Sequence, residues 1–463
     1  MLIIERYERV MKEKRGSFSG GLGFVLAAAG SAVGLGNLWR FPYLAAQYGG
    51  GIFIFVYLIL VLTFGYSMLV MEIGIGRKTK KSSISAFKQL DKKFSVFGYL
   101  AMIVPMIILP YYCVIGGWVL KYMLVFLSGK ATVSAAAADD YFGGFISATW
   151  SPLIMFLIFF AITIVIVLAG VEKGVERVSK LMMPILVLIS IGICVYVTTI
   201  PGSFEGIKYY LFPDFSKFSF KTVCGAMGQM FYSMSLAMGI MISYGSYVKD
   251  DVNIGKAVGH IEIFDTGIAV MAGFMIIPVV YMFSGEAGLA TGGPGLMFKT
   301  LPKVFDTMPL GTVIGAAFFV LVLFAALTSS ISIMEAIVSN LMDGFKLSRK
   351  KAVAIIIAIS LVLGAITSLG NGVLSHVTIL GMDFLTFFDY FSNSVLMPIV
   401  ALGTCIMIGW GIGTKVIEEE VTKNGDKMSR VKIFRIMVKY IAPVCMMIIL
   451  VAYSLAQFGI ITL

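Results

Sequence analysis

The chain has 463 residues, of which 59% are hydrophobic and 13% charged, and its mean hydropathy is +0.95. Apolar runs of about twenty residues, the length that a helix needs to cross a bilayer, recur along the whole sequence. This composition excludes a soluble protein and predicts an all-α polytopic membrane protein. The net charge of +11 does not indicate nucleic-acid binding, because the Lys and Arg residues gather in alternate loops.

The apolar runs predict eleven membrane spans, centred on residues 20–43, 50–75, 96–127, 152–170, 179–200, 222–247, 257–284, 309–341, 352–370, 382–409 and 439–461. Basic residues cluster at 77–81 (RKTKK), at 346–351 (KLSRKK) and between 415 and 439. The positive-inside rule then predicts a cytoplasmic amino terminus, and an odd number of spans puts the carboxyl terminus outside. We expect a multi-pass protein in the lipid of the inner or plasma membrane.

Other interpretations find little support in the residues. The apolar run before "LAAAG" (26–30) is too short for a signal peptide. The five cysteines have no paired or metal-ligand spacing, and the two histidines are far apart. No nucleophile, metal cluster or acid/base pair converges, so an enzyme is not expected.

The first span contains the stretch "GSAVGLGNLWR" (30–40), whose polar residues and glycines are unusual in lipid. Gly30 and Gly34 form a GxxxG pair, which packs helices closely. Packing does not account for Gly36, Asn37 and Arg40. The alternative is an interrupted helix, whose unwound centre offers N–H and C=O groups to a bound carboxylate and a small cation.

Transporters with interrupted helices are usually built from two inverted repeats, which predicts a second break five spans later. The sixth span contains "GQMFYSMSLAMGIMISYGSY" from Gly228, with serines and a glycine around Ser233 to Gly239. The expected organisation is a cytoplasmic segment 1–19, a first repeat 20–200, an outer loop 201–221, a second repeat 222–410, a cytoplasmic loop 411–438 and an eleventh span 439–463.

Long ordered motifs resemble the neurotransmitter:sodium symporter family of LeuT-type transporters. They are "GSAVGLGNLWRFPYLAAQYGGG" (30–51), "EIGIGR" (72–77), the tyrosines at 111 and 112, "GQMFYSMSL" (228–236) and "FAALTSSISIMEA" (324–336). The resemblance implies a LeuT-type 5+5 inverted repeat with broken first and sixth helices, and a sodium-coupled amino-acid symporter with alternating access. Twelve spans is the commoner number in the family, and this chain lacks the last.

The resemblance implies two sodium sites. The second would use carbonyls of Gly30, Val33 and Ala325 with the hydroxyls of Thr328 and Ser329, since hard oxygen ligands suit a small cation. The alternative for these hydroxyls is a bond back to their own helix.

The first sodium site would use Ala32, Asn37 and Ser233, together with the substrate carboxylate. Its ligand from the seventh span is open between Glu262, Asp265 and Thr266, and the spacing to Gly273 and Pro278 favours Asp265. Chloride-dependent relatives hold an anion near this position. We interpret Asp265 as the fixed negative charge that makes transport chloride-independent; the alternative is a residue facing the cytoplasm.

By the same resemblance, the substrate carboxylate would meet backbone N–H groups near Leu35 and Gly36 and the hydroxyl of Tyr112. The amino group would meet carbonyls near Ala32, Tyr232 and Ser233 and the hydroxyl of Ser235. The side-chain pocket would be formed by Leu35, Ile108, Tyr112, Tyr232, Ser235, Met238, Ser329, Ser332 and Ile333. None of these is charged, which predicts a neutral and mostly apolar substrate side chain. Met238 can move aside for a large ligand, so we expect a large hydrophobic or aromatic amino acid.

Gate residues follow from the resemblance as well. Arg40 is expected to pair with Asp383 across an outer vestibule, above Tyr112 and Tyr232. On the inner side, Arg15 is expected to pair with Asp343, with Phe18 and Tyr247 supporting the pair. The alternatives are interfacial snorkelling for Arg40 and positive-inside charge for Arg15. Glu72 is expected to hold the unwound part of the sixth span.

Two alternatives to symport remain. A substrate-gated channel or a non-transporting amino-acid sensor would keep the same sites. A proton-coupled relative with this fold would lose the Thr328 and Ser329 hydroxyls, which are present here.

Overall fold

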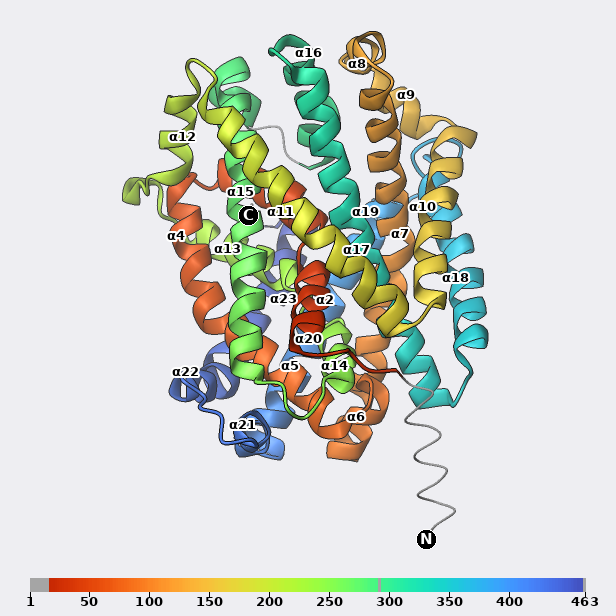
Figure 1. Ribbon diagram of the computed structural model, residues 1–463, viewed down its shortest axis with the longest axis vertical. Coiled ribbons are helices and arrows are strands. Elements are labelled where there is room, and N and C mark those ends of the chain that lie inside the picture. Colours follow the sequence, from red (N-terminus) through yellow and green to blue (C-terminus); the bar gives the residue numbers. More distant parts are fainter. Residues whose placement is uncertain (1–15, 290–292, 461–463) are drawn as a thin grey trace.

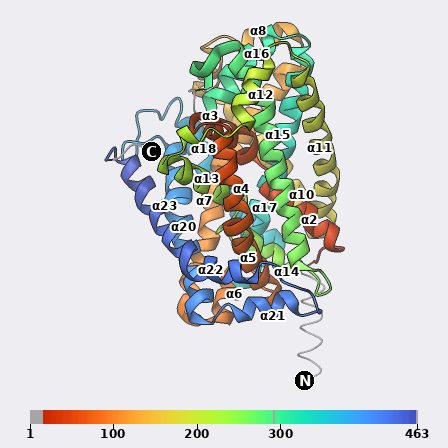
Figure 2. The same ribbon diagram turned by 90° about the vertical axis from the view of Figure 1, so that its left-hand side faces the viewer.

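The computed structural model describes residues 16–289 and 293–460, and within these residues the chain forms helices and no named strand. Figures 1 and 2 show an upright bundle of long helices. By length and composition, nine helical segments of the described residues can cross a membrane, and a bent pair supplies a tenth. The predicted all-α membrane fold is therefore confirmed.

The uninterrupted spans follow one another along the chain. They are α4 (Gly51–Leu60) with η2 (Val61–Gly65) and α5 (Tyr66–Thr79), α7 (Ser95–Leu127), α10 (Trp150–Leu168), η4 (Val171–Glu176) with α11 (Arg177–Thr198), α15 (Ile254–Leu289), α17 (Gly311–Phe345) and α18 (Arg349–Leu369). The last two are α19 (Phe384–Asp389) with η7 (Tyr390–Leu396), α20 (Met397–Ile406) and η8 (Met407–Gly411), and α22 (Val431–Ile436) with η9 (Met437–Ile441) and α23 (Ala442–Gln457).

Shorter helices occupy the two ends of the bundle. They are α6 (Ser83–Leu90), α8 (Lys130–Ala136), α9 (Tyr141–Ser147), α12 (Ser203–Leu211), η5 (Phe215–Lys217), η6 (Leu296–Thr300), α16 (Leu301–Thr307) and α21 (Lys415–Thr422).

The first span is broken where the glycine-rich stretch predicted. Helix α2 (Gly21–Ala32) ends at Ala32, and the chain resumes as the π-helical turn η1 (Gly36–Arg40) followed by α3 (Phe41–Gln47). The two halves are bent by 48°. Val33 takes extended backbone angles (φ −73°, ψ 100°), which ends the hydrogen-bond ladder of α2.

The sixth span is broken too. Helix α13 (Phe220–Ser233) and helix α14 (Ile240–Tyr247) are separated by residues 234–239. Three residues there have positive φ: Ser235 at 54°, Ala237 at 58° and Gly239 at 66°. Side chains other than glycine adopt this conformation at a cost, so the surrounding structure holds it in place. With this second interrupted helix, the described residues account for the eleven predicted spans.

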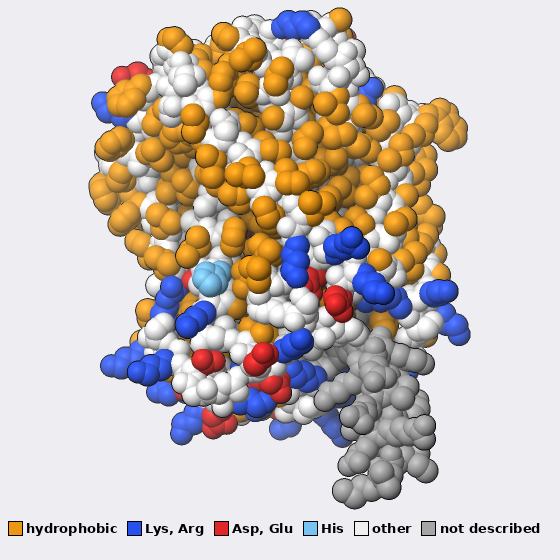
Figure 3. Space-filling view, viewed as in Figure 1, with side chains coloured by type: hydrophobic (Ala, Val, Ile, Leu, Met, Phe, Trp, Pro, Cys, Tyr) orange, Lys and Arg blue, Asp and Glu red, His pale blue; other side chains and the backbone are white. Residues whose placement is uncertain are grey.

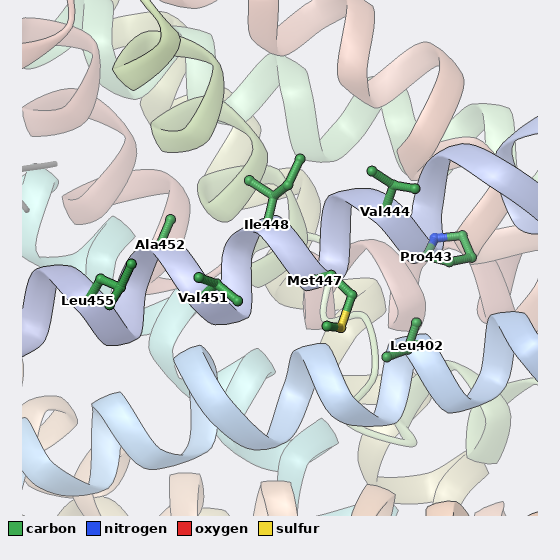
Figure 4. Close-up of a pocket in the computed structure, with 8 residues that line it drawn as sticks. All are labelled: Leu402, Pro443, Val444, Met447, Ile448, Val451, Ala452 and Leu455. Carbon is green, nitrogen blue, oxygen red and sulfur yellow. The ribbon is translucent and has the colours of Figure 1, made fainter.

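The surface of the bundle has an apolar middle and a basic end. On the face in Figure 3, hydrophobic side chains cover the middle of the bundle, and Lys and Arg gather at the end that carries α21 and α22. Helices α20 and α23 leave an apolar groove of about 560 Å³ between them. Figure 4 shows its lining, which includes Leu402, Met447 and Val451 and contains no polar side chain. Such a lining suits contact with lipid.

Candidate substrate and sodium site

The two helix breaks face each other in the centre of the bundle. The Gln229 amide of α13 donates to the Gly36 carbonyl at 2.8 Å, and the Ser235 hydroxyl donates to the Ser31 carbonyl at 3.1 Å. A Cβ at Gly36 would lie 2.9 Å from the Tyr232 ring. Only glycine therefore permits this approach. Backbone carbonyls at the first break accept hydrogen bonds from side chains of the second.

Asp265 of α15 lies beside both breaks, fully buried. Its Oδ1 accepts hydrogen bonds from Asn37 Nδ2 and Ser233 Oγ, both at 2.8 Å, and its Oδ2 accepts one from the Tyr57 hydroxyl at 3.3 Å. Asn37 also donates to the Asp265 carbonyl at 2.9 Å. The structure thus brings together Asn37, Ser233 and Asp265.

The other two candidates in the seventh span lie in different surroundings. Glu262 accepts two hydrogen bonds from Arg430 Nη1, at 3.0 and 3.1 Å, and this arginine also lies over the Tyr66 ring. Among the described residues, the buried hydroxyl of Thr266 has no hydrogen-bond partner. Of the three candidates, Asp265 is the one that forms hydrogen bonds to both breaks in this part of the chain, through Asn37 and Ser233. Tyr57, which sequence reasoning missed, lies in the second span one helical turn after Phe53 with no polar motif around it.

The residues predicted for the second sodium site also meet. Ser329 Oγ lies 3.1 Å from the Ser31 carbonyl, 3.3 Å from that of Val33 and 3.5 Å from that of Gly30. Thr328 Oγ1 lies 3.1 Å from the Ala325 carbonyl. The Ser329 hydroxyl of α17 therefore reaches the open carbonyl end of α2, whereas the Thr328 hydroxyl bonds back to its own helix, as the alternative interpretation expected. Both hydroxyls donate to carbonyls here, and each oxygen keeps lone pairs for a cation.

The predicted substrate residues surround the same region. Tyr112 of α7 accepts a hydrogen bond from the Leu35 N–H at 3.3 Å. A Cβ at Gly34 would lie 2.4 Å from Ser329 Oγ and 3.0 Å from the Tyr112 hydroxyl. Ser332 donates to the Ser329 carbonyl at 2.8 Å, so its hydroxyl proton bonds its own helix. The remaining side chains of the predicted pocket that are buried are Ile108, Met238 and Ile333.

At the outer gate, the structure differs from the expected pair of Arg40 and Asp383. Within the described residues, no ion pair joins Arg40 to Asp383. Asp383 caps α19 instead, accepting hydrogen bonds from Thr386 N at 3.0 Å and Thr386 Oγ1 at 2.6 Å. An aspartate directly before an apolar helical run is a capping signature, and this signal was overlooked.

Asp389 is an acidic residue close enough to Arg40 for their charges to interact, although no ion pair joins the two in the described part of the chain. Its Oδ1 accepts hydrogen bonds from Asn393 at 2.7 Å and from Tyr111 at 3.2 Å. The Arg40 guanidinium lies 5.3 Å from the centre of the Tyr232 ring. Asp389 lies six residues after Asp383, about 9 Å further along the helix at 1.5 Å per residue, and replaces it as the candidate outer partner of Arg40.

At the inner gate, Arg15, the expected partner of Asp343, lies outside the described residues. Asp343 accepts hydrogen bonds from the N–H and the hydroxyl of Ser82, both at 2.8 Å. Phe18 is buried, with its ring edge-on to Tyr247. Tyr247 donates to Glu335 at 2.9 Å.

Glu335 is a further polar residue that the sequence analysis did not assign. It is fully buried, and Arg349 at the start of α18 contacts both of its carboxylate oxygens at 2.7 Å. An intramembrane glutamate requires such a partner, which is the signal that could have identified the pair. Glu72 behaves as expected, because its Oε1 accepts the Ala237 N–H in the second break at 2.7 Å.

Comparison with known proteins decides the family. The model of the sodium:neurotransmitter symporter family matches residues 15–136 and 146–462. The chain belongs to this family. It is 34% identical to a sodium-dependent transporter of Haemophilus influenzae, over 95% of this chain and 98% of the relative. It is 33% identical to one of Methanocaldococcus jannaschii, over 95% and 89%.

Other members of the family are similar at lower identity or in solved structure. A sodium- and chloride-dependent taurine transporter of Rattus norvegicus is 28% identical, over 86% of this chain and 72% of the relative. The crystal structure of MhsT in complex with L-phenylalanine superposes with a TM-score of 0.85 at 34% identity, covering 95% of this chain and all of MhsT. This symporter is a sodium-coupled membrane transporter and not an enzyme, and sodium is its coupling ion.

Proposed function

We propose that this symporter carries neutral hydrophobic amino acids, with two sodium ions and without chloride. The observation that carries the proposal is the meeting of two helix breaks at one buried carboxylate, Asp265, while none of the predicted substrate residues is charged. A broken helix offers N–H groups and carbonyls that suit the two charged groups of a zwitterion. MhsT, which is similar over nearly the whole chain, was crystallised with L-phenylalanine.

The substrate class follows from the lining. Leu35, Ile108, Met238 and Ile333 are apolar and buried. A charged substrate side chain would lie among them without a partner, which costs several kcal/mol. Met238 can shift to admit a large side chain, because methionine has three rotatable bonds. We therefore propose aromatic and large aliphatic amino acids as the substrates that bind best.

The sodium sites are proposed on the residues described above. Ala32, Asn37, Ser233 and Asp265 would hold the first ion together with the substrate carboxylate. The second would lie between α2 and α17, on Gly30, Val33, Ala325, Thr328 and Ser329. Because Asp265 carries its own negative charge next to the first ion, an added chloride would be redundant.

We also propose the orientation of the protein in the membrane and the inward movement of sodium together with substrate. With the amino terminus in the cytoplasm, as the basic end of the bundle suggests, the carboxyl terminus lies outside the inner or plasma membrane. Two sodium ions entering with one zwitterion carry about two charges, worth roughly 4.6 kcal/mol at ~100 mV. The gates near Arg40 and Tyr247 would open alternately.

Uptake by proteoliposomes tests the proposal. Vesicles with an inward sodium gradient should accumulate radiolabelled phenylalanine or leucine above the outside concentration, equally in chloride and gluconate. A substrate-gated channel would equilibrate the label without accumulation, and a sensor would bind it without flux. Competition by glycine, glutamate or lysine that exceeds competition by tyrosine, tryptophan and leucine would refute the proposed substrate class.

A further inference from the structure

The loop between α12 and α13, together with the first residue of α13, carries an unusual set of exposed aromatic side chains. Phe212, Phe215, Phe218 and Phe220 are between 54% and 65% exposed, within ten residues of chain that belong to no predicted span. We call these four residues the phenylalanine set. Soluble loops rarely expose so much contiguous apolar surface, so the set requires a partner.

The preceding helix packs against a membrane-spanning helix. Helix α12 packs tightly along α15, where a Cβ at Gly206 would come within 2.5 Å of the Pro278 backbone. The Tyr210 hydroxyl donates to the Val270 carbonyl at 2.8 Å, and Val270 lies near the middle of the span Ile254–Phe283. Figure 1 shows α12 beside α15, with the following loop projecting at the left edge next to α4.

The loop then touches the lipid-facing side of α4. Gly50 and Pro213 form an isolated antiparallel bridge where the second span begins. The Phe215 ring meets the Phe55 ring at 5.8 Å, edge to face. Phe55 lies one helical turn inside the span, about 6 Å beyond its first residue, and is itself 44% exposed. The phenylalanine set therefore continues the hydrophobic surface of a membrane-spanning helix.

The polar residues of the loop line a cavity. This cavity of about 400 Å³ beside the loop is lined by Gln47, Tyr48, Tyr209, Lys217, Ser219 and Thr222. The Lys217 ammonium group lies 4.9 Å from the centre of the Tyr209 ring. A cation and hydroxyls next to exposed rings are the arrangement of a segment at the level of phospholipid headgroups.

We propose that residues 211–220 are anchored in the outer leaflet of the bilayer. The phenylalanine set enters the acyl-chain region, and the cavity at Lys217 receives a headgroup phosphate. The loop joins directly to α13, the outer half of the broken sixth span, and the cavity borders Tyr48 at the end of α3, the outer half of the first. Lipid at this position would therefore contact both outer half-helices of the transport site.

Spin labels measure the position of the loop relative to the bilayer, and this measurement does not depend on transport activity. Single cysteines would replace Phe215 and Phe218 in a background without the native cysteines, with Val165→Cys on the lipid-facing side of α10 and Ala138→Cys near the tip of α8 as controls. In nanodiscs, labels at 215 and 218 should be accessible to oxygen and protected from a water-soluble nickel complex, as at 165. Accessibility like that at 138 would overturn the proposal.

A second measurement separates anchoring from folding. Replacing the phenylalanine set with Leu should keep sodium-driven uptake within about twofold, while replacing it with Ser should lower uptake several-fold and raise nickel accessibility at a label on Ser216. Both variants should keep substrate binding in detergent, where no bilayer is present. Full uptake by the Ser variant with nickel accessibility unchanged would contradict the assignment.

Discussion

Asn37 of the first broken helix and Asp265 of the seventh span form two hydrogen bonds, from one amide nitrogen to a carboxylate oxygen at 2.8 Å and to a backbone carbonyl at 2.9 Å. This amide thus links the break to α15 through a fully buried carboxylate. A buried carboxylate is costly unless it is hydrogen-bonded or paired with a cation. The three side-chain donors around Asp265 carry no charge, so a sodium ion is the natural counter-charge.

The first prediction concerns chloride. Asp265→Asn removes the negative charge and keeps the size of the side chain, so sodium-driven uptake should fall at least tenfold in gluconate and recover partly in chloride. Uptake by the unchanged protein should be equal in both anions. Glu262→Gln is the matched control, since Glu262 pairs with Arg430 away from the helix breaks. Chloride dependence of the unchanged protein would rule out Asp265 as the substitute for the anion.

A second prediction tests the sodium site on α17. Thr328→Ala or Ser329→Ala should each raise the sodium concentration for half-maximal uptake, because a hydrogen-bond-like contact to a charged group is worth about 1.5–3 kcal/mol, roughly tenfold or more. Ser330→Ala is the control on the same helix, since Ser330 bonds Thr163 and Leu327 instead. An equal response of all three variants would argue against a site at Thr328 and Ser329.

The outer gate gives a third prediction. Asp389→Asn should slow uptake several-fold and shorten the lifetime of bound substrate, because the negative charge proposed to act on Arg40 is lost. Asp383→Asn should leave uptake close to normal, since asparagine caps a helix as well as aspartate does. Dissociation of radiolabelled substrate measures the difference. The opposite ranking of the two variants would restore Asp383 as the gate residue.

The inner pair of Glu335 and Arg349 gives the fourth prediction. The Glu335 side chain is 0% exposed and that of Arg349 19%, so Glu335→Gln leaves a mostly buried cation unpaired, at a cost of about 3–5 kcal/mol. The thermal midpoint in detergent should fall. The double variant Glu335→Gln with Arg349→Met should recover part of this loss. If the double variant is less stable than Glu335→Gln alone, the pair is not the source of the effect.

Several features followed from the sequence alone, for local reasons. The span count depends on runs of apolar residues of sufficient length, and lipid imposes that length wherever the helices pack. The breaks were visible because glycines at 30, 34 and 36, with Asn37, make a lipid-exposed continuous helix unfavourable. The cap at Asp383 was equally local and readable, although the resemblance drew attention away from it.

Other features were decided only by the tertiary structure. Asp389, Tyr57 and Arg349 carry no motif. Each became a candidate because the fold places a residue of another span near it, namely Arg40, Asp265 and Glu335. The choice among Glu262, Asp265 and Thr266 likewise depended on which face of α15 meets the breaks. Spacing along one helix predicts which residues share a face, but only packing determines which neighbour that face contacts.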